Sequence, residues 1–169
     1  FLIRASYDRW WEARIIWGGI VNYSRSFARE IITLTDSSLE IKRESIHRHI
    51  AWMYCLKQQL RKKEVFQGAS YYLHVDEKRN LETKNNVATQ LIKNQGIQLK
   101  DRYDKQELSN YNLVQINTTL NEMYNLQGRC ERIKNTEFPR EYYFLSRFFV
   151  ISFTTLLPFH LIDTLGIGV

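Results

Sequence analysis

Apolar side chains recur at helical spacing along most of this 169-residue chain. Over residues 1–34 the series includes Phe27, Ile31 and Leu34, and no proline interrupts it, so the pattern predicts one long helix. Residues 36–38, Asp-Ser-Ser, are helix-ending side chains and predict the stop.

The same polar cluster predicts the start of a second helix. Ser37 and Glu40 fit a capping box, in which the hydroxyl accepts a hydrogen bond from a free backbone amide while the carboxylate reaches back to the cap. This helix is expected to run to about Lys63, with a narrow apolar stripe beside a strongly basic face.

Further along, polar residues 65–85 predict an irregular connecting segment. A short helix near Val87 is expected to end at Gly96, because glycine suits the left-handed C-terminal cap. From about Lys105 to Asn135, apolar residues step by three, four or five and predict a second long helix. Since the chain has seven glycines and two prolines, few points break these helices, and the predicted fold is all-α.

An apolar run closes the chain. Pro139 predicts the start of another helix, and from Phe148 to Val169 the only formally charged side chain is that of Asp163. A helix of this length is about 33 Å long, enough for a hydrocarbon core of about 30 Å. The run therefore predicts a membrane-spanning helix, the other interpretation being a buried core helix.

Basic residues precede this run, so the positive-inside rule places its N-terminal side, and with it the second to fourth predicted helices, in the cytoplasm. They are Arg129, Arg132, Lys134, Arg140 and Arg147. The chain begins without an initiator Met and ends directly after the apolar run, and we interpret it as part of a longer protein.

Two tryptophans stand side by side in the charged segment 7–14. Trp10 and Trp11 point about 100° apart on a helix, so they cannot both enter one core stripe. Tryptophan favours the boundary between membrane and water, where its ring is apolar and its N–H stays wet. The segment is thus predicted to lie at that boundary, although an aromatic core with surface charges would give a similar pattern.

Reactive chemistry has no clear candidate. His47 and His49 are two residues apart, which directs them to different faces of a helix, whereas a metal pair needs a spacing of four. Cys55 and Cys130 lie far apart and are expected to be reduced thiols. Without a phosphate loop or a nucleophile motif, we expect neither an enzyme, nor a metal site, nor a cofactor.

The formal net charge is +6 and the isoelectric point is about 9.3, which makes an anionic neighbour plausible. Part of this charge lies on the second predicted helix, at Lys42, Arg43, Arg48, Lys57, Arg61, Lys62 and Lys63. Such a stripe could bind the phosphates of a nucleic acid, but more often it is simply a solvent-exposed face of a helix. No helix-turn-helix pattern accompanies it. Nucleic acid is not the expected partner.

Several blocks of uncommon residues follow one another along nearly the whole chain. They are residues 7–14, 17–18, 21–25, 49–52, 60–61, 130–139 and 156–159. In this order they resemble a bacterial member of the bestrophin family of ion channels. The family in turn implies three parts: the end of the second membrane helix with its cytoplasmic continuation (1–34), a cytoplasmic helical region (35–138) and a truncated third membrane helix (139–169).

By this resemblance the chain would be the pore-forming subunit of a homopentamer, multi-pass in a membrane, most simply the bacterial plasma membrane. Its partners would be further copies, membrane lipid and small inorganic ions, with either anions or monovalent cations passing a central pore. The acidic calcium clasp of eukaryotic members has no counterpart here, so no bound calcium is expected. A soluble helical interaction module with a basic face is the competing hypothesis.

The resemblance also implies roles for particular residues. Phe1 falls where the last apolar residue of the family's narrow neck would lie. A lower constriction falls at Val114, or failing that at Ile116. Glu131 and Arg132, within the most diagnostic block, would hold the junction between the cytoplasmic and membrane helices.

Overall fold

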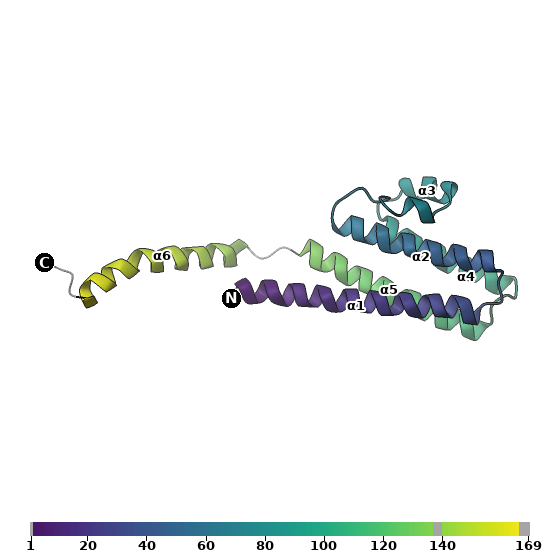
Figure 1. Ribbon diagram of the computed structural model, residues 1–169, viewed down its shortest axis with the longest axis horizontal. Coiled ribbons are helices and arrows are strands. Elements are labelled where there is room, and N and C mark those ends of the chain that lie inside the picture. The colour runs from purple at the N-terminus through teal and green to yellow at the C-terminus, as the bar shows by residue number, and fades with distance from the viewer. Residues whose placement is uncertain (1, 137–139, 166–169) are drawn as a thin grey trace. The chain divides into compact units, whose positions relative to one another are not determined.

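The computed structural model describes residues 2–136 and 140–165, and in this part of the chain every regular element is a helix. Figure 1 shows them in order: α1 (Leu2–Leu34), α2 (Leu39–Leu60), a 3₁₀ turn (Ser70–Tyr72), α3 (Val75–Glu82), α4 (Val87–Asp104), α5 (Asn110–Asn135) and α6 (Arg140–Leu165). The predicted all-α fold is confirmed for these residues.

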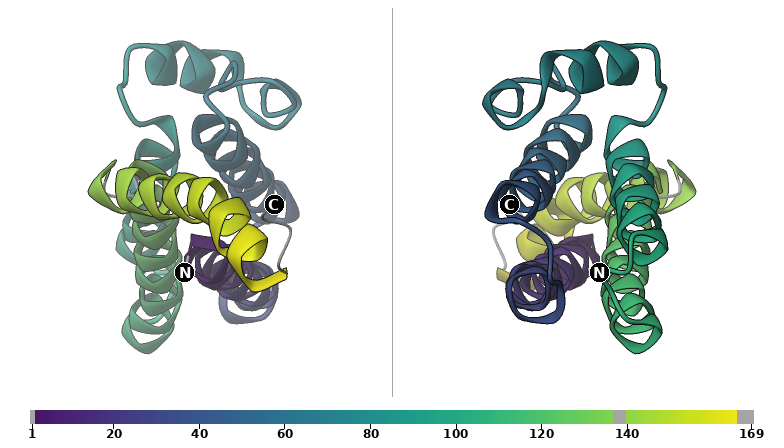
Figure 2. Two further views of the ribbon diagram at one scale, coloured as in Figure 1. Left: turned by 90° about the vertical axis from the view of Figure 1, so that its left-hand side faces the viewer. Right: turned by 90° about the vertical axis from the view of Figure 1, so that its right-hand side faces the viewer.

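The chain forms two compact units. Unit 1 combines Phe1–Trp11 with Asn135–Val169, and unit 2 is Glu12–Lys134. Within unit 2, α1, α2, α4 and α5 run side by side as a four-helix bundle, seen along the helices in Figure 2. The 3₁₀ turn packs on α2, and α3 packs on α4.

One face of α1 builds the core of unit 2. Ile16, Ile20, Phe27 and Ile31 are fully buried or nearly so, at the spacing of a single helical stripe. Gly19 faces α5, because a Cβ atom at this position would lie 3.2 Å from the side chain of Leu126, which would have to shift to accommodate it. The periodicity that predicted α1 is therefore the periodicity of a buried face.

The indole of Trp52 ties α2 to α5 inside this core. Its side chain is 1% exposed, and its Nε1–H donates a 2.9 Å hydrogen bond to Oε1 of Gln127, which is equally buried. The Gln127 amide in turn donates to Thr89 Oγ1 on α4 at 2.8 Å. A buried indole N–H and a buried amide thus satisfy each other, and three helices share the contact.

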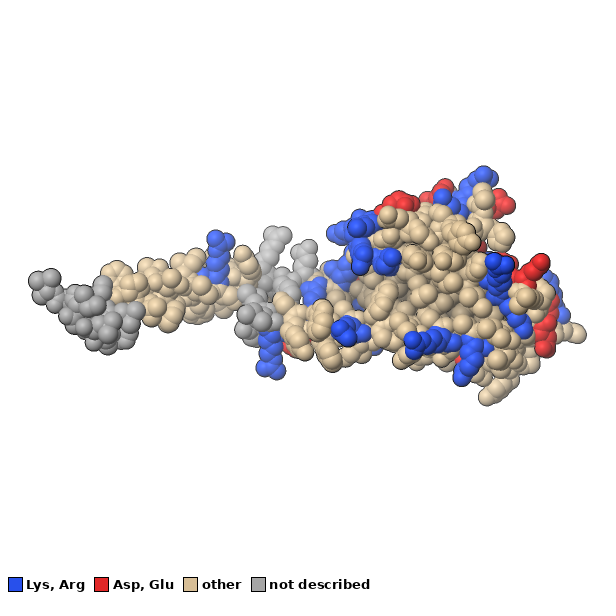
Figure 3. All heavy atoms as spheres, viewed as in Figure 1, with Lys and Arg blue, Asp and Glu red and all other residues tan. Residues whose placement is uncertain are grey.

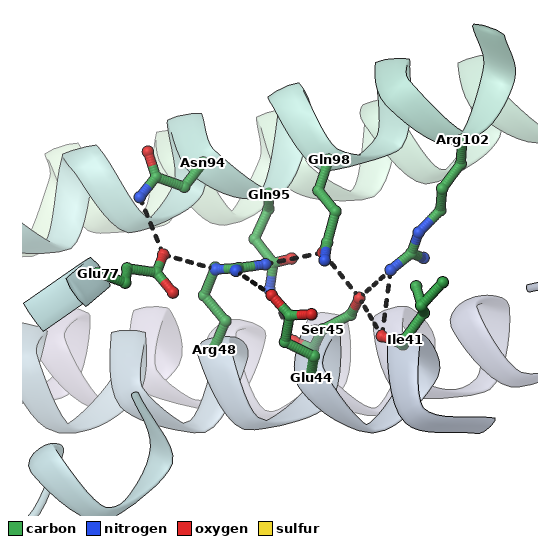
Figure 4. A network of polar contacts seen from close by, with 9 residues as sticks. All are labelled: Ile41, Glu44, Ser45, Arg48, Glu77, Asn94, Gln95, Gln98 and Arg102. Carbon is green, nitrogen blue, oxygen red and sulfur yellow. Dashed lines mark hydrogen bonds and ion pairs between the residues drawn. The ribbon is translucent and has the colours of Figure 1, made fainter. Parts of the chain in front are cut away.

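Polar side chains fill the interface between α2 and α4 (Figure 4). Arg48, 7% exposed, donates from Nε to Glu77 and from Nη1 to Gln98, both at 2.7 Å, and from Nη2 to Glu44. Burial alone would lower the pKa of Arg48, but the hydrogen bonds and charges of Glu77 and Glu44 outweigh it and raise the pKa. Arg48 is consequently no part of a solvated basic face, which corrects its placement in the predicted stripe.

A second arginine extends this network toward the start of α2. Arg102, 2% exposed, donates from Nη2 to Ser45 Oγ and to the carbonyl of Ile41. The amide of Gln95 donates to the Ser45 carbonyl at 2.8 Å. The two helices are therefore held by side-chain hydrogen bonds along much of their shared length.

The start of α2 lies one residue later than predicted. Ser38, not Ser37, is the N-cap, and its Oγ accepts a hydrogen bond from the backbone N–H of Ile41. The Ser37 hydroxyl instead donates to Glu107 at 2.6 Å, which joins the α1–α2 turn to the α4–α5 turn. The predicted capping box was wrong because adjacent serines offered two possible registers.

Helical structure also extends further than predicted in the middle of the chain. The segment 65–85 contains the 3₁₀ turn and α3, whose first turn carries Asp76 and Glu77 at the favourable N-terminal end. Gly96 does not end a helix, since α4 continues past it to Asp104. The α5 helix begins at Asn110 rather than near Lys105, because α4 occupies the preceding residues.

Both α2 and α4 end in a turn that normally uses glycine. After α4, Gln106 has φ of 60°, its N–H bonds to the Tyr103 carbonyl, and the Glu107 N–H bonds to the Arg102 carbonyl. After α2, Lys62 has φ of 54° with the equivalent pair of bonds. This is the Schellman arrangement, and a side chain in the left-handed conformation costs free energy that glycine avoids.

Replacing Gln106 by glycine should therefore stabilise unit 2. The substitution Gln106→Gly relieves the left-handed strain while the unfolded chain gains flexibility, and the net gain expected is about 0.5–1 kcal/mol. Chemical denaturation of the wild type and the variant measures it. A variant that is less stable than the wild type would contradict the claim that the conformation of Gln106 is strained.

Candidate membrane and pore surfaces

Helix α6 carries the apolar surface that a membrane requires. Between Glu141 and Phe159, 19 residues are apolar enough and long enough to cross a bilayer, and none is buried within the chain. Phe144, Phe148 and Phe153 are 56–72% exposed. A core helix of a soluble protein would cover such rings, so the exposed surface favours the membrane interpretation over a buried core helix.

The aromatic cluster near the start of α1 is only partly covered. Trp10 and Trp11 are each about half exposed, and their ring centroids lie 6.1 Å apart. Tyr7 stacks on Trp11 at 6.4 Å with an interplanar angle of 9°. Their spacing predicted that the two tryptophans could not both enter one core stripe, and in the structure neither does. The three rings form one amphipathic surface of the kind found at membrane–water boundaries.

Contacts inside unit 1 connect this cluster to the segment before α6. The guanidinium Nη2 of Arg9 donates a hydrogen bond to the carbonyl of Thr136. Residues far apart in sequence, at the beginning of α1 and just after α5, are thereby joined. Phe1, the predicted neck residue, lies outside the described residues.

The two candidate constriction residues lie on opposite sides of α5. Val114 is 59% exposed, whereas Ile116 is fully buried in the core of unit 2. A residue that lines a pore between copies must be exposed in the single chain. Val114 meets this requirement and Ile116 does not, so only Val114 is kept as a candidate.

An uncharged outward face surrounds Val114. From Asn110 to Gly128, every exposed side chain of α5 is uncharged, and Glu122 is half-buried. The exposed residues include Tyr111, Val114, Asn117, Thr118, Asn121, Tyr124 and Asn125. Our sequence reasoning missed this face because it followed apolar residues; the signal was the four-residue spacing of three asparagines.

Glu131 lies where three helices meet. Its Oε1 accepts hydrogen bonds from Asn86 Nδ2 at 3.0 Å and from Gln127 Nε2 at 2.9 Å, which connects the end of α5 to the start of α4. Lys134 Nζ donates to the carbonyl of Gln59 near the end of α2. Arg132, one position along, is exposed. A structural role for Glu131 agrees with these contacts, while its role at the membrane junction stays a prediction.

Two buried side chains, His49 and Cys55, lie in surroundings that suppress their reactivity. Among the residues that the structure describes, no group of three His, Cys, Asp or Glu side chains could hold a metal ion. His49 stacks between Phe27 and Trp52, and burial lowers its pKa to about 4. Burial, assisted by the charge of Glu64, raises the pKa of the Cys55 thiol to about 12, which makes it unreactive.

Comparison with known proteins identifies the class of protein that has this helical unit and apolar helix. The sequence profile of the Bacterial/Fungal Bestrophin protein family matches residues 1–169. The chain therefore belongs to the bestrophin family, as the order of its sequence blocks predicted, and is a membrane protein.

Individual relatives agree. A voltage-dependent anion channel-forming protein of Nostoc sp. is 29% identical over 98% of this chain and 55% of its own length. The protein YneE of Escherichia coli O157:H7, of the same description, is 30% identical over 96% of this chain and 53% of its own. This chain thus spans about half the length of the curated relatives it matches.

Solved structures agree on the fold. The crystal structure of a mutant of a bacterial bestrophin homologue from Klebsiella pneumoniae matches with a TM-score of 0.89 and 25% identity over 95% of this chain and 58% of that one. A second crystal structure, described only as that of a mutant membrane protein, has a TM-score of 0.90 at 25% identity, over 95% and 60% respectively.

The buried imidazole of His49 should make the stability of unit 2 depend on pH. The folded state holds it neutral down to about pH 4, whereas in the unfolded chain it takes up a proton near pH 6.5. Stability should therefore fall as pH decreases from 6.5 to 4, by at most roughly 3 kcal/mol. The variant His49→Phe keeps the stack with Phe27 and Trp52 without titrating. Denaturation at several pH values should show a shallower slope for the variant, and identical slopes would contradict the assignment.

Proposed function

We propose that the chain is part of the pore-forming subunit of a bestrophin-like channel that passes anions. The family match over residues 1–169 carries the proposal. The exposed apolar surface of α6 supports it, because a channel subunit needs a helix in contact with lipid. The competing hypothesis, a soluble interaction module with a basic face, gives no reason for that surface.

Selectivity for anions is the finer part of the proposal. The relatives from Nostoc and Escherichia coli are described as anion channel-forming proteins. On this chain, the outward face of α5 offers side-chain amides and hydroxyls, whose N–H and O–H groups can solvate an anion, and no exposed carboxylate up to Gly128. A monovalent cation pathway would be favoured by acidic rings, so the cation alternative is the weaker one.

The assembly we propose is a homopentamer in which the outward face of α5 contributes to a cytoplasmic vestibule. Val114 would form the lower constriction and Phe1 the end of the neck. Trp10 and Trp11 would lie at the membrane boundary and between subunits, where their exposed halves would be covered. Glu131 and Arg132 would hold the end of α5 near the following membrane helix, with helices α2 to α5 in the cytoplasm.

Reversal potentials test the function directly. The complete subunit, reconstituted in a planar bilayer with asymmetric potassium chloride, should give a reversal potential near the chloride equilibrium value. A potential near the potassium value would establish the cation alternative, and absence of current would contradict the channel.

Substitution at the constriction tests the pore residue. With Val114→Ala the narrowest cytoplasmic point should widen, so the permeability of a large anion relative to chloride should rise. Stability should change little, within about 0.5 kcal/mol, because an exposed valine loses few contacts.

Ile116→Ala serves as the matched control two residues away. It empties a fully buried site and should cost about 2–5 kcal/mol while leaving relative permeability unchanged in the channels that still assemble. Relative permeability measured beside thermal unfolding separates the two positions. A destabilising Val114→Ala with unaltered permeability would remove Val114 from the pore.

A further inference from the structure

Three helix ends meet at one end of unit 2. The Ala88 backbone N–H, at the start of α4, donates to Gln59 Oε1 near the end of α2 at 3.1 Å. Asn86, at the start of α4, donates to Glu131 on α5. Lys134, also on α5, donates to the carbonyl of Gln59 near the end of α2. These bonds hold the C-termini of α2 and α5 and the N-terminus of α4 together, and we call this the basic end.

Exposed cations crowd the basic end. They are Arg61, Lys62, Lys63, Lys84, Arg129 and Arg132. Three carboxylates lie nearby and keep their negative charge: Glu131 and Glu64 accept hydrogen bonds from uncharged amides, and Glu82 lies 3.8 Å from Lys78. The six exposed cations outnumber them, so the net charge of this end is positive.

The opposite end of unit 2 differs. There the turns on either side of the bundle carry exposed acidic residues, among them Asp36, Glu40, Asp101 and Asp104, beside Lys42, Arg43, Lys100 and Lys105. Lys105 is paired with Asp101 at 2.7 Å. On the face in Figure 3, Lys and Arg without neighbouring Asp or Glu appear over the left-hand end of unit 2, whereas over α3 and at the right-hand end both signs of charge appear together.

Lys62, one of the exposed cations, has a backbone conformation that costs free energy for any residue but glycine. Lys62 occupies the left-handed position after α2, where glycine would avoid strain. Glycine would complete the same turn, so the turn itself does not require a lysine. The charge of Lys62 is thus a feature that the fold does not need.

A short segment of chain connects the basic end to the helix proposed to cross the membrane. Lys134 belongs to the basic end, and α6 begins at Arg140, six residues later. A segment of that length spans at most about 20 Å when fully extended. The connection is therefore short enough for the exposed cations to reach lipid headgroups next to the N-terminal side of α6.

From these observations we infer that the basic end of unit 2 binds the anionic phospholipid headgroups of the membrane that α6 crosses. Clusters of lysine and arginine beside a membrane helix attract anionic lipid, and each cation near the surface contributes to the attraction. This inference needs α6 in a membrane and does not depend on ion conduction. It accounts for the three consecutive cations after the end of α2, to which the proposed channel function assigns no role.

Position is tested with a fluorophore on the complete subunit in nanodiscs. Labels attached through Lys63→Cys and, as the matched control at the opposite end, Lys100→Cys are compared in discs whose lipids carry a headgroup quencher. Quenching at position 63 should exceed that at position 100 by about twofold or more, because the effect falls off with distance from the membrane surface. Equal quenching at the two positions would overturn the inference.

Charge is tested by thermal unfolding in phosphatidylcholine nanodiscs with and without phosphatidylglycerol. Phosphatidylglycerol should raise the Tm of the wild type, since a ligand that binds the folded state stabilises it. Lys62→Gly and Gln106→Gly should both raise the Tm in phosphatidylcholine, because both relieve a left-handed side chain. Only Lys62→Gly should reduce the additional rise given by phosphatidylglycerol.

The triple change Arg61→Gln, Lys62→Gln and Lys63→Gln should abolish most of that additional rise, and added salt should reduce it in the wild type. The triple change Lys42→Gln, Arg43→Gln and Lys100→Gln, at the other end, should leave it intact. An equal loss in both triple variants would reduce the effect to net charge and overturn the inference. The inference would also be overturned if a soluble oligonucleotide, added to the wild type in phosphatidylcholine nanodiscs, raised the Tm as much as phosphatidylglycerol does.

Discussion

The burial of Arg48 between α2 and α4 is the constraint on which the helical unit depends. A guanidinium removed from water needs partners for its donors, and Glu44, Glu77 and Gln98 supply them from three helices. Losing one partner of such a buried pair typically costs about 3–5 kcal/mol. The interface is consequently specific rather than merely apolar, since sliding α4 along α2 by one turn would separate Arg48 from Gln98.

This register determines where the ends of the helices lie. With α2 and α4 fixed, Gln59 faces the start of α4, and Trp52 meets Gln127 of α5 inside the core. The end of α5, which leads toward α6, is thereby tied to the other two helices through Glu131 and Lys134. Displacing the end of α5 from α2 and α4 would therefore break these hydrogen bonds.

The sequence predicted the helices better than the contacts between them. Periodicity found the long helices because each buries one stripe, as Ile20, Phe27 and Ile31 do on α1. It placed Arg48 on a solvated face, because the burial of that arginine depends on Glu77, which is distant in sequence and lies on a helix that was not predicted. A local pattern contains no information about such a partner.

The outward face of α5 shows a related limit of sequence reasoning. Val114 and Ile116 are both apolar and two residues apart, so the resemblance to the family left both as candidates, and packing against the bundle separated them. A helix of an ordinary soluble bundle presents charges on its outer face. On α5 the outer face carries asparagine, threonine, tyrosine and valine instead. These amide and hydroxyl groups form hydrogen bonds with water without carrying a fixed charge, which is the property that the proposed lining of an anion pathway requires.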